Sequence, residues 1–210
     1  MPLQREVVIR DLGSGDETAA IDLLAEAFLE FPAMHVLVGR DDGARDRLRR
    51  LYAMEFEPGS GTRAIGAEVG GRLVGALTYM DSPACGTASA GRTARFLRIA
   101  GPRILRTMRM FGRIERAHPQ APHRHLPTVG VLPELQSQGI GARLMQVFDE
   151  RCDADAASAY LETIRWADPT KASHERFYGR LGYMVSRVIP MTDEWSVLTM
   201  TRPPAAPLAG

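Results

Sequence analysis

The sequence has little cysteine: only Cys85 and Cys152 occur among 210 residues, far apart and without a partner motif. So few cysteines argue against a disulfide framework and favour a reducing compartment. No apolar run approaches the roughly 20 residues that a helix needs to cross a bilayer. The first residues, Met1 to Glu6, form no apolar signal segment. We therefore expect a cytoplasmic protein without a membrane partner.

Net charge is also nearly absent, because 26 Lys+Arg stand against 25 Asp+Glu and leave a formal charge of +1. This balance gives no general reason to expect nucleic acid as a partner. Internal repeats and long low-complexity stretches are missing as well. With 45% hydrophobic residues, a chain of this length can bury one ordinary core. We expect one domain over residues 1–202 and a disordered, proline-rich tail over 203–210.

The spacing of apolar residues predicts a mixed α/β fold that starts with a hairpin and continues with alternating units. Ser14 and Glu17 form a capping-box pattern ahead of the first helix, and Pro32 should end that helix. Gly70-Gly71 suits a tight hairpin turn. The predicted helices cover residues 15–28, 44–56, 92–117 with a break at Gly101-Pro102, 139–151 and 173–181. The predicted strands cover residues 6–10, 63–69, 73–80, 125–131, 160–164, 183–190 and 195–201.

The most informative stretch runs from Thr128 to Met145, where a strand leads through a short loop into a helix that has Gly139 and Gly141 in its first turn. The first amides of a helix lack internal partners and carry partial positive charge, and glycines let a phosphate approach the backbone. A dinucleotide fingerprint fails here because Leu144 occupies its third small position, and no Gly-Lys-Ser/Thr of a P-loop occurs. The alternative is that the glycines only permit tight packing of helix on strand.

The residues around these glycines resemble a known family. The pattern Gln136-x-x-Gly139-x-Gly141 resembles the acetyl-CoA pyrophosphate loop of the GNAT superfamily, and the segment 177–183 resembles its F-Y-x-x-L-G-F/Y segment. Within the superfamily the sequence is most similar to puromycin acetyltransferase-like proteins. That narrower similarity rests on Ala27-Phe28-x-x-x-Pro32, Thr128-Val129-Gly130-Val131 and Leu161-Glu162-Thr163.

The resemblance implies a single-domain GNAT fold, with a mixed, mostly antiparallel sheet, a splayed central strand pair and helices on both faces. It implies an N-acetyltransferase that uses acetyl-CoA and no metal. The acetyl group would pass directly, in a ternary complex, to a primary amine of a small molecule. Two alternatives stay open: a catalytically silent acyl-CoA-binding sensor or interaction module, and a nucleic-acid-binding protein.

The resemblance also assigns site residues. Backbone groups of the strand before the loop would pair with the pantetheine arm, and the loop amides would bind the pyrophosphate. Tyr178 would protonate the leaving thiolate, and the Val131 amide would polarise the thioester carbonyl. The residues expected at the cofactor are Val129, Gly130, Val131, Gln136, Ser137, Gln138, Gly139, Ile140, Gly141, Ala142 and Tyr178.

Acetyl transfer to an amine also requires removal of a proton from that amine. Glu162 is the first candidate for this base, because partial burial within an apolar strand would raise its pKa. Its alternative role is to bind the cation of the substrate. Glu30, near the end of the first helix, is a second candidate and an expected substrate contact, and a base acting through a chain of waters is a third. The connection from Thr163 to Phe177 is longer than in the similar proteins, and His174 replaces their asparagine.

Two further features of the sequence, a histidine pair and a group of arginines, each allow more than one interpretation. His123 and His125 alternate along one strand; an H-x-H pair can bind metal, but no third ligand lies near in sequence, which favours strand-end histidines beside a cleft. Eight arginines and one acid lie between Arg92 and Arg116. A solvated basic face is favoured there over a patch for the CoA 3′-phosphate, an acidic acceptor or nucleic acid. The identity of the amine and the oligomeric state stay open, with a homodimer as one option.

Overall fold

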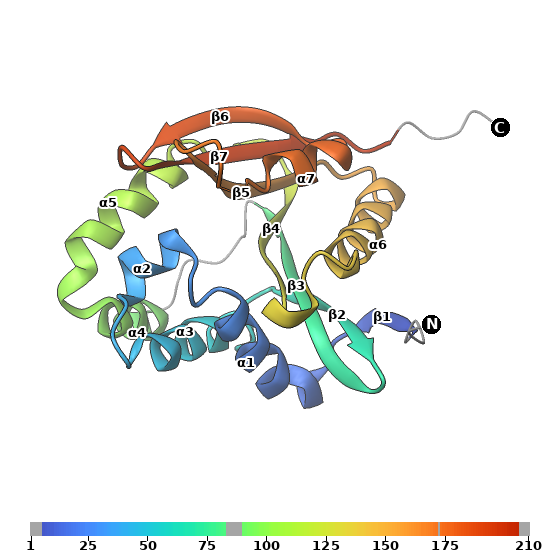
Figure 1. Ribbon diagram of the computed structural model, residues 1–210, viewed down its shortest axis with the longest axis horizontal. Coiled ribbons are helices and arrows are strands. Elements are labelled where there is room, and N and C mark those ends of the chain that lie inside the picture. Colours follow the sequence, from blue (N-terminus) through green and yellow to red (C-terminus); the bar gives the residue numbers. More distant parts are fainter. Residues whose placement is uncertain (1–5, 83–89, 172, 206–210) are drawn as a thin grey trace.

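The computed structural model describes residues 6–82, 90–171 and 173–205, which form one sheet covered by helices (Figure 1). The sheet has seven strands in the order β1-β2-β3-β4-β5-β7-β6 within these residues. Neighbouring strands are antiparallel except β4 and β5, which are parallel. The strands are β1 (Val7–Asp11), β2 (Arg63–Val69), β3 (Arg72–Ser82), β4 (His123–Val131), β5 (Ala159–Trp166), β6 (Met184–Pro190) and β7 (Trp195–Arg202).

The helices follow the expected order, with one additional helix at Pro32–Val38. They are α1 (Glu17–Ala27), α2 (Pro32–Val38), α3 (Ala44–Ala53), α4 (Ala90–Ala100), α5 (Ile104–Glu115), α6 (Ile140–Ala154) and α7 (Glu175–Arg180), with short 3-10 turns at Ser14–Asp16, Gly101–Arg103 and Pro133–Leu135. The predicted break at Gly101-Pro102 is confirmed by the turn between α4 and α5. The predicted tail falls partly outside the described residues, and the amide of Ala205, in its described part, donates to Asp153.

Two expectations at the first helix are wrong. Pro32 does not end that helix, which already stops at Ala27; it is the first residue of α2, where its fixed φ and missing N–H suit a helix start. The pair Ser14 and Glu17 does not form the capping box. Instead the Asp16 carboxylate accepts a hydrogen bond of 2.9 Å from the Gly13 amide, so the pair lies one residue earlier, where a 3-10 turn precedes α1.

Helices α1 and α6 pack on opposite faces of the central strands β3 and β4. A Cβ built on Gly130 of β4 would lie 3.0 Å from Ala27 of α1, whereas one built on Gly75 of β3 would lie 3.1 Å from Leu144 of α6. Cross-strand partners point to the same face, and Gly75 pairs with Val131 while Gly130 pairs with Ala76. The alternation along β4 therefore directs Gly130 to α1 and Val131 to α6.

The sheet divides where β4 and β5 meet. Among the described residues, these strands pair only at Arg124, His125 and Leu126, so the rest of β4 diverges from β5. Figure 1 shows β5, β7 and β6 above this opening and β3, β2 and β1 below it. The expected splay near Val129–Val131 is thus confirmed. A second apolar cluster, which includes Val36 of α2, Met110 of α5 and Trp195 of β7, covers the upper half.

Strand β4 contains an irregularity that changes which side chains share a face. Thr128 pairs with Thr78 and His125 pairs with Met80, so two residues of β4 stand opposite Tyr79 alone. Such a bulge reverses the alternation, and proline is tolerated there, as at Pro127. The bulge therefore allows His125 and Thr128, three residues apart, to face the same side of the sheet.

Candidate active site

The glycine-rich loop presents its backbone to solvent at the start of α6. Gln136, Ser137, Gln138 and Gly139 are all exposed, and α6 begins at Ile140. Gly139 has a φ of 83°, a left-handed conformation that suits glycine, and a Cβ on it would meet no atom within 4 Å. Gly139 is therefore required by backbone conformation, and the free amides of a 15-residue helix lie directly beside it.

The last residues of β4 turn backbone groups into the opening of the sheet. The Leu132 amide donates to the Val74 carbonyl at 3.0 Å, so Leu132 faces β3 in the ladder. Alternation in an antiparallel ladder then directs the N–H and C=O of Val129 and Val131 away from β3. The Gln136 side chain donates to the Val131 carbonyl at 3.1 Å, in agreement with this direction. Val129 and Val131 thus lie where an extended ligand can add hydrogen bonds like those of a strand.

The aromatic segment after β5 approaches the same loop. A Cβ on Gly141 would lie 3.8 Å from both Phe177 and Val131, so α7, α6 and β4 converge at this point. Tyr178 follows on α7, is 7% exposed and packs its ring 5.9 Å from that of Tyr183. Burial raises the pKa of Tyr178 above its ordinary value. Its hydroxyl therefore remains protonated at neutral pH, as a proton donor must.

A cluster of three histidines surrounds Glu162 on the other side of the opening. The His125 Nε2 donates to Glu162 at 2.8 Å, and the His118 Nδ1 lies 3.7 Å from the second carboxylate oxygen. The His118 ring also packs against Tyr160 with a centroid distance of 4.6 Å. The interpretation of His123 and His125 as strand-end histidines agrees with this arrangement. His118, by contrast, was not recognised in the sequence, because only folding brings it to Glu162.

The hydrogen bonds of the cluster determine where its protons lie. The His123 Nδ1 must donate to the Ala121 carbonyl at 2.8 Å, so the Nε2 of a neutral His123 is an acceptor. Burial lowers the pKa of His123, which favours this neutral form. The His118 Nε2, 3.0 Å away, then has to be the donor. The other ring nitrogen of His118, Nδ1, faces the Glu162 carboxylate.

The expected raised pKa of Glu162 is wrong. Burial does oppose its ionisation, but the contacts from His118 and His125 outweigh burial and lower the pKa to about 2. A carboxylate this acidic is a weak proton acceptor at neutral pH. Glu162 therefore fits the alternative role, in which a permanent negative charge attracts or orients a cation.

A second carboxylate, Glu55, lies near the bulge of β4 and was missed in the sequence. It follows α3 and accepts hydrogen bonds from the hydroxyls of Thr78 at 2.8 Å and Thr128 at 3.4 Å. Burial raises its pKa, and these hydrogen bonds and the charge of His125 only partly oppose the rise. The single sequence signal is an acid between Met54 and Phe56 at the end of a charged helix.

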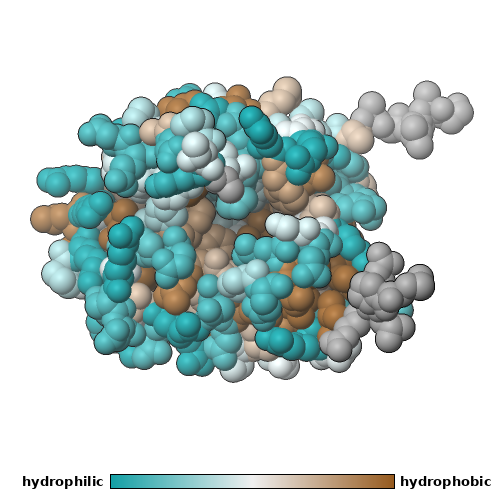
Figure 2. Space-filling model, in the orientation of Figure 1, coloured by the Kyte–Doolittle hydropathy of each residue, from teal (hydrophilic) through white to brown (hydrophobic). Residues whose placement is uncertain are grey.

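Glu30 lies at the surface of the protein. It occupies the turn between α1 and α2, and its side chain is 91% exposed. The rings of Phe28 and Phe31 flank this turn and pack edge to face at 5.3 Å. Figure 2 shows apolar side chains inside a hollow near the centre of this face of the molecule. The role of Glu30 as a substrate contact therefore stays a prediction.

The structure bears on two features that the sequence left open, the possible metal site and the arginine-rich helices. In the described residues, no group of histidine, cysteine and acidic side chains is arranged to hold a metal ion. The arginine-rich helices are largely solvated: Arg98, Arg106 and Arg109 are exposed, and so are Leu105 and Met108 beside them. Helix α5 lies at the left edge in Figure 1 and α6 at the right, so the arginines lie away from the predicted pyrophosphate loop.

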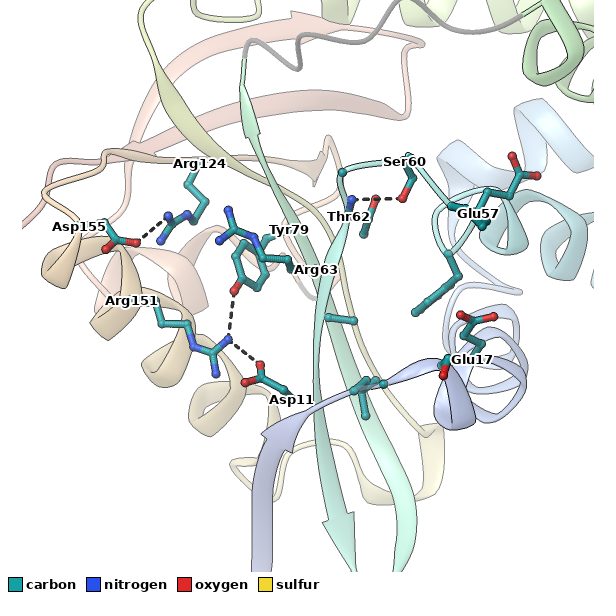
Figure 3. A pocket seen from close by; sticks show the side chains of 18 of the residues that line it. Asp11, Glu17, Glu57, Ser60, Thr62, Arg63, Tyr79, Arg124, Arg151 and Asp155 are labelled. Atoms are coloured by element: carbon teal, nitrogen blue, oxygen red, sulfur yellow. Dashed lines mark hydrogen bonds and ion pairs between the residues drawn. The ribbon is translucent and has the colours of Figure 1, made fainter.

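A polar cavity lies elsewhere, with a volume near 730 Å³ beside β1, β2 and the end of α6 (Figure 3). Three arginines line it and are already paired: Arg63 with Asp81, Arg124 with Asp155, and Arg151 with Asp11 and the Tyr79 hydroxyl. These ion pairs account for its three arginines within the fold. The cavity contains none of the residues predicted at the cofactor.

Solved structures share the architecture over nearly the whole chain. A histone acetyltransferase HPA2 and related acetyltransferase from Corynebacterium glutamicum has a TM-score of 0.73 at 24% identity, covering 97% of this chain and 99% of its own. A polyamine N-acetyltransferase of Drosophila melanogaster, which forms N-acetylagmatine, has a TM-score of 0.63 at 18% identity, with 94% and 100% covered. PaiA N-acetyltransferase from Thermoplasma acidophilum, in complex with coenzyme A, has a TM-score of 0.55 at 13% identity, with 94% and 99% covered. The fold is that of the GNAT acetyltransferases.

One segment of the chain also matches a family model in sequence. Residues 103–185 match the family model of the acetyltransferase (GNAT) domain, a segment that includes β4, the glycine-rich loop, α6, β5 and α7. This segment is therefore similar to the GNAT acetyltransferase domain, and the fold of the described residues agrees with that match. The narrower similarity to puromycin acetyltransferase-like proteins stays a prediction.

Proposed function

We propose that this protein transfers the acetyl group of acetyl-CoA to the primary amine of a small, cationic molecule. The observation that carries the proposal is the opening after Leu126, where β4 leaves β5 and turns the backbone of Val129 and Val131 towards the gap. The start of α6 adjoins that opening. An extended pantetheine arm and a diphosphate together require such a pair of sites, one with strand geometry and one at a helix start.

In this proposal the cofactor contacts come from three elements. Val129 and Val131 bind the pantetheine arm through their backbone, Gly130 between them pairs with Ala76 of β3, and the Val131 amide polarises the thioester carbonyl. The diphosphate contacts the loop that begins at Gln136, whose members are Gln136, Ser137, Gln138, Gly139, Ile140, Gly141 and Ala142. Tyr178 donates its proton to the departing thiolate. The buried, protonated state of Tyr178 supports this role.

The acceptor would bind on the opposite side of β4, between the α1–α2 turn and the histidine cluster. The ionised Glu162 supports a cationic substrate there, because its charge is retained at any ordinary pH. Glu30 at the rim adds a second negative charge beside Phe28 and Phe31. Substrate-binding residues of this kind hold amine and thioester together, and such positioning can lower a barrier by several kcal/mol. Polyamine acetylation by one of the similar enzymes is in keeping with a cationic acceptor.

A thiol-release assay tests the proposal. Acetyl-CoA is incubated with the protein and a panel of diamines, polyamines, amino acids and aminoglycosides, and the acetylated product is identified by mass spectrometry. We expect thiol release that depends on the amine and rises with the number of positive charges on it. A matched panel of fully N-methylated amines should release none, because a tertiary amine cannot form an amide.

The alternative is a sensor that binds acetyl-CoA without turnover. Calorimetry would then show acetyl-CoA binding while no amine of the panel releases thiol. A protein that binds no acetyl-CoA at all would contradict both proposals. Among the described helices none is long and apolar enough to cross a membrane; a cytoplasmic location and a homodimer stay predictions.

A further inference from the structure

The low pKa of Glu162 argues against it as the base, and the 91% exposed side chain of Glu30, the second candidate, lies in water and not in a buried site. The amine of an alkylammonium has a pKa of about 10, so at neutral pH nearly every acceptor molecule must lose a proton before it can attack. A suitable proton acceptor must lie on the side of β4 where the amine would bind, and close to the thioester. It must also be less acidic than Glu162.

Glu55 meets these requirements by position. Its hydrogen-bond donor Thr128 precedes Val131, the proposed thioester contact, by only three residues, or about 10 Å along a strand. Thr128 and Thr78 are cross-strand partners, so both hydroxyls hold the Glu55 carboxylate against the same face of the sheet. Two rungs further along β4, Gly130 contacts α1 on that face. A carboxylate at this position can reach an attacking amine through one or two ordered waters.

The groups around Glu55 come from four elements. Thr78 lies on β3, Thr128 and His125 on β4, Tyr52 on α3 and Arg92 on α4, and the charges of His125 and Arg92 act on the Glu55 carboxyl. The Tyr52 side chain is 2% exposed, and its hydroxyl has no hydrogen-bond partner in the described residues. A buried hydroxyl without a partner indicates an ordered water or a bound ligand atom. Tyr52 therefore marks where the bridging water would be held.

A polar path continues from Glu55 to the histidine cluster. His125 lies between the two carboxylates, since it donates to Glu162 and its charge acts on Glu55. Beyond Glu162, His118 and His123 extend the chain of polar contacts. The hydroxyls of Tyr160 and Thr199 in this region are buried without a hydrogen bond of good geometry in the described part of the chain. These hydroxyls offer further positions for water along the path.

We propose that Glu55 is the general base of the reaction and accepts the amine proton through a water at Tyr52; this inference rests on the proposed function. The proton of the ammonium passes to the Glu55 carboxylate, the neutral amine attacks the thioester carbon, and a C–N bond forms. The C–S bond then breaks, and Tyr178 donates its proton to the thiolate. The second nitrogen proton returns to the Tyr178 oxygen as the amide forms. Glu55 releases its proton to solvent, so one proton is released for each acetyl group transferred.

The test compares Glu55→Gln with wild type on two acceptors of similar shape, an alkylamine and a weakly basic analogue that is neutral at the assay pH. The glutamine oxygen can still accept from Thr78 and Thr128, so the change removes basicity with little change of shape. We expect kcat for the alkylamine to fall about 10-fold or more, with a clearly smaller loss for the weakly basic analogue. The acetyl-CoA Kd should stay within about 2-fold of wild type, because no cofactor contact changes. The acid limb of the wild-type pH–rate profile should disappear in the variant.

Glu57→Gln is the matched control, because Glu57 lies two residues away and pairs with Arg95; it should keep wild-type turnover. If Glu55→Gln melts early, Glu55→Asp replaces it, and it should lose rate on the alkylamine while keeping the acid limb. Equal losses on both acceptors, or a rise in KM with unchanged kcat, would overturn the role as base. A wild-type protein that acetylates no amine while binding acetyl-CoA would instead overturn the proposed function, and this inference with it.

Discussion

Tyr178 is a buried hydroxyl whose pKa lies above its usual value because of burial. A group that keeps its proton until a thiolate forms suits an acid catalyst. We expect Tyr178→Phe to lower kcat by about 10-fold or more with little change in acetyl-CoA affinity. Steady-state kinetics and calorimetry on the same preparation measure the two quantities.

Tyr79→Phe provides the control for that change. Its hydroxyl accepts from Arg151 at 3.0 Å, in the polar cavity beside β1 and β2. Removing it should leave turnover unchanged, since Tyr79 lies outside the proposed site. Wild-type turnover in Tyr178→Phe would reject the acid role.

Glu162 can be recognised as a candidate from the sequence, but its pKa cannot be predicted there. A carboxylate within the apolar strand Tyr160 to Ile164 stands out in the sequence, and the structure places it beside the opening. Its protonation was predicted with the wrong sign, because His118 lies 44 residues away in the chain. The charge of a group depends on neighbours that only the fold assembles.

At the scale of the element, the two glycines at the start of α6 have different physical requirements. Gly139 has a φ of 83°, whereas a Cβ on Gly141 would make only ordinary contacts of 3.8 Å. We expect Gly139→Ala to lower the free energy of unfolding by about 1–2 kcal/mol, the cost of a left-handed backbone with a side chain. Gly141→Ala should change it by less than about 0.5 kcal/mol. Denaturant unfolding of both variants makes the comparison.

The same pair tests the pyrophosphate site. If the diphosphate lies against the first turn of α6, a methyl group at Gly141 should weaken acetyl-CoA binding by about 10-fold, or about 1.4 kcal/mol. Binding as tight as that of wild type would place the diphosphate elsewhere. Gly141→Ala is informative because its fold should be intact.

Helix α6 also contains a buried acid that makes stability depend on pH. Burial raises the pKa of Asp149 to about 6, although the Tyr183 hydroxyl donates to it at 2.7 Å and opposes the rise. The folded pKa lies above the unfolded one, so the stabilisation by protonated Asp149 is complete below about pH 4 and lost as the pH rises through 6. Asp149→Asn should therefore be more stable than wild type at pH 8, on the order of 1–3 kcal/mol.

Unfolding in denaturant at pH 4 and pH 8 measures this difference. At pH 4 the variant and wild type should unfold at nearly the same concentration, because Asp149 is already neutral in the fold. The asparagine oxygen can still accept from Tyr183, so the hydrogen bond is retained. An equal difference at both pH values would show that packing, and not charge, causes it.

At the scale of the molecule, the two halves of the sheet meet through only three paired positions of β4 and β5 in the described residues. A cofactor in the opening would add hydrogen bonds to β4 and contacts to α6 and α7. We expect acetyl-CoA to slow amide exchange in peptides that cover residues 127–132 and 137–142. At about 100 times its Kd, it should also raise the unfolding free energy by about 2.7 kcal/mol. Exchange detected by mass spectrometry, with and without acetyl-CoA, measures the effect.

The edge strands provide the comparison within that experiment. Strand β1 and the β2–β3 hairpin lie away from the opening, so their exchange should be the same with and without acetyl-CoA. Uniform slowing throughout the chain would indicate global stabilisation without a defined site. Protection confined to the polar cavity beside Arg63 and Arg151 would place the cofactor in the wrong part of the molecule.

Local patterns in the sequence were sufficient for the order of the elements other than α2, for the hairpin at Gly70-Gly71, for the break at Gly101-Pro102 and for the helix start after Gly139. Each of these depends on interactions within a few residues: side-chain periodicity, backbone conformation and helix termini. The first helix cap was wrong, because two local candidates, Ser14 and Asp16, compete within one turn.

Only the tertiary structure decided how the site is charged. The bulge of β4, where two residues oppose Tyr79, turns His125 and Thr128 to one face, and Glu55, His118 and Glu162 meet there from three separate segments. The reason is physical: a pKa depends on burial and on charges a few ångströms away, and those distances exist only after the chain has folded. The residue types of the acetyltransferase motifs are thus present in the sequence, but how acidic each carboxylate of the site is depends on the fold.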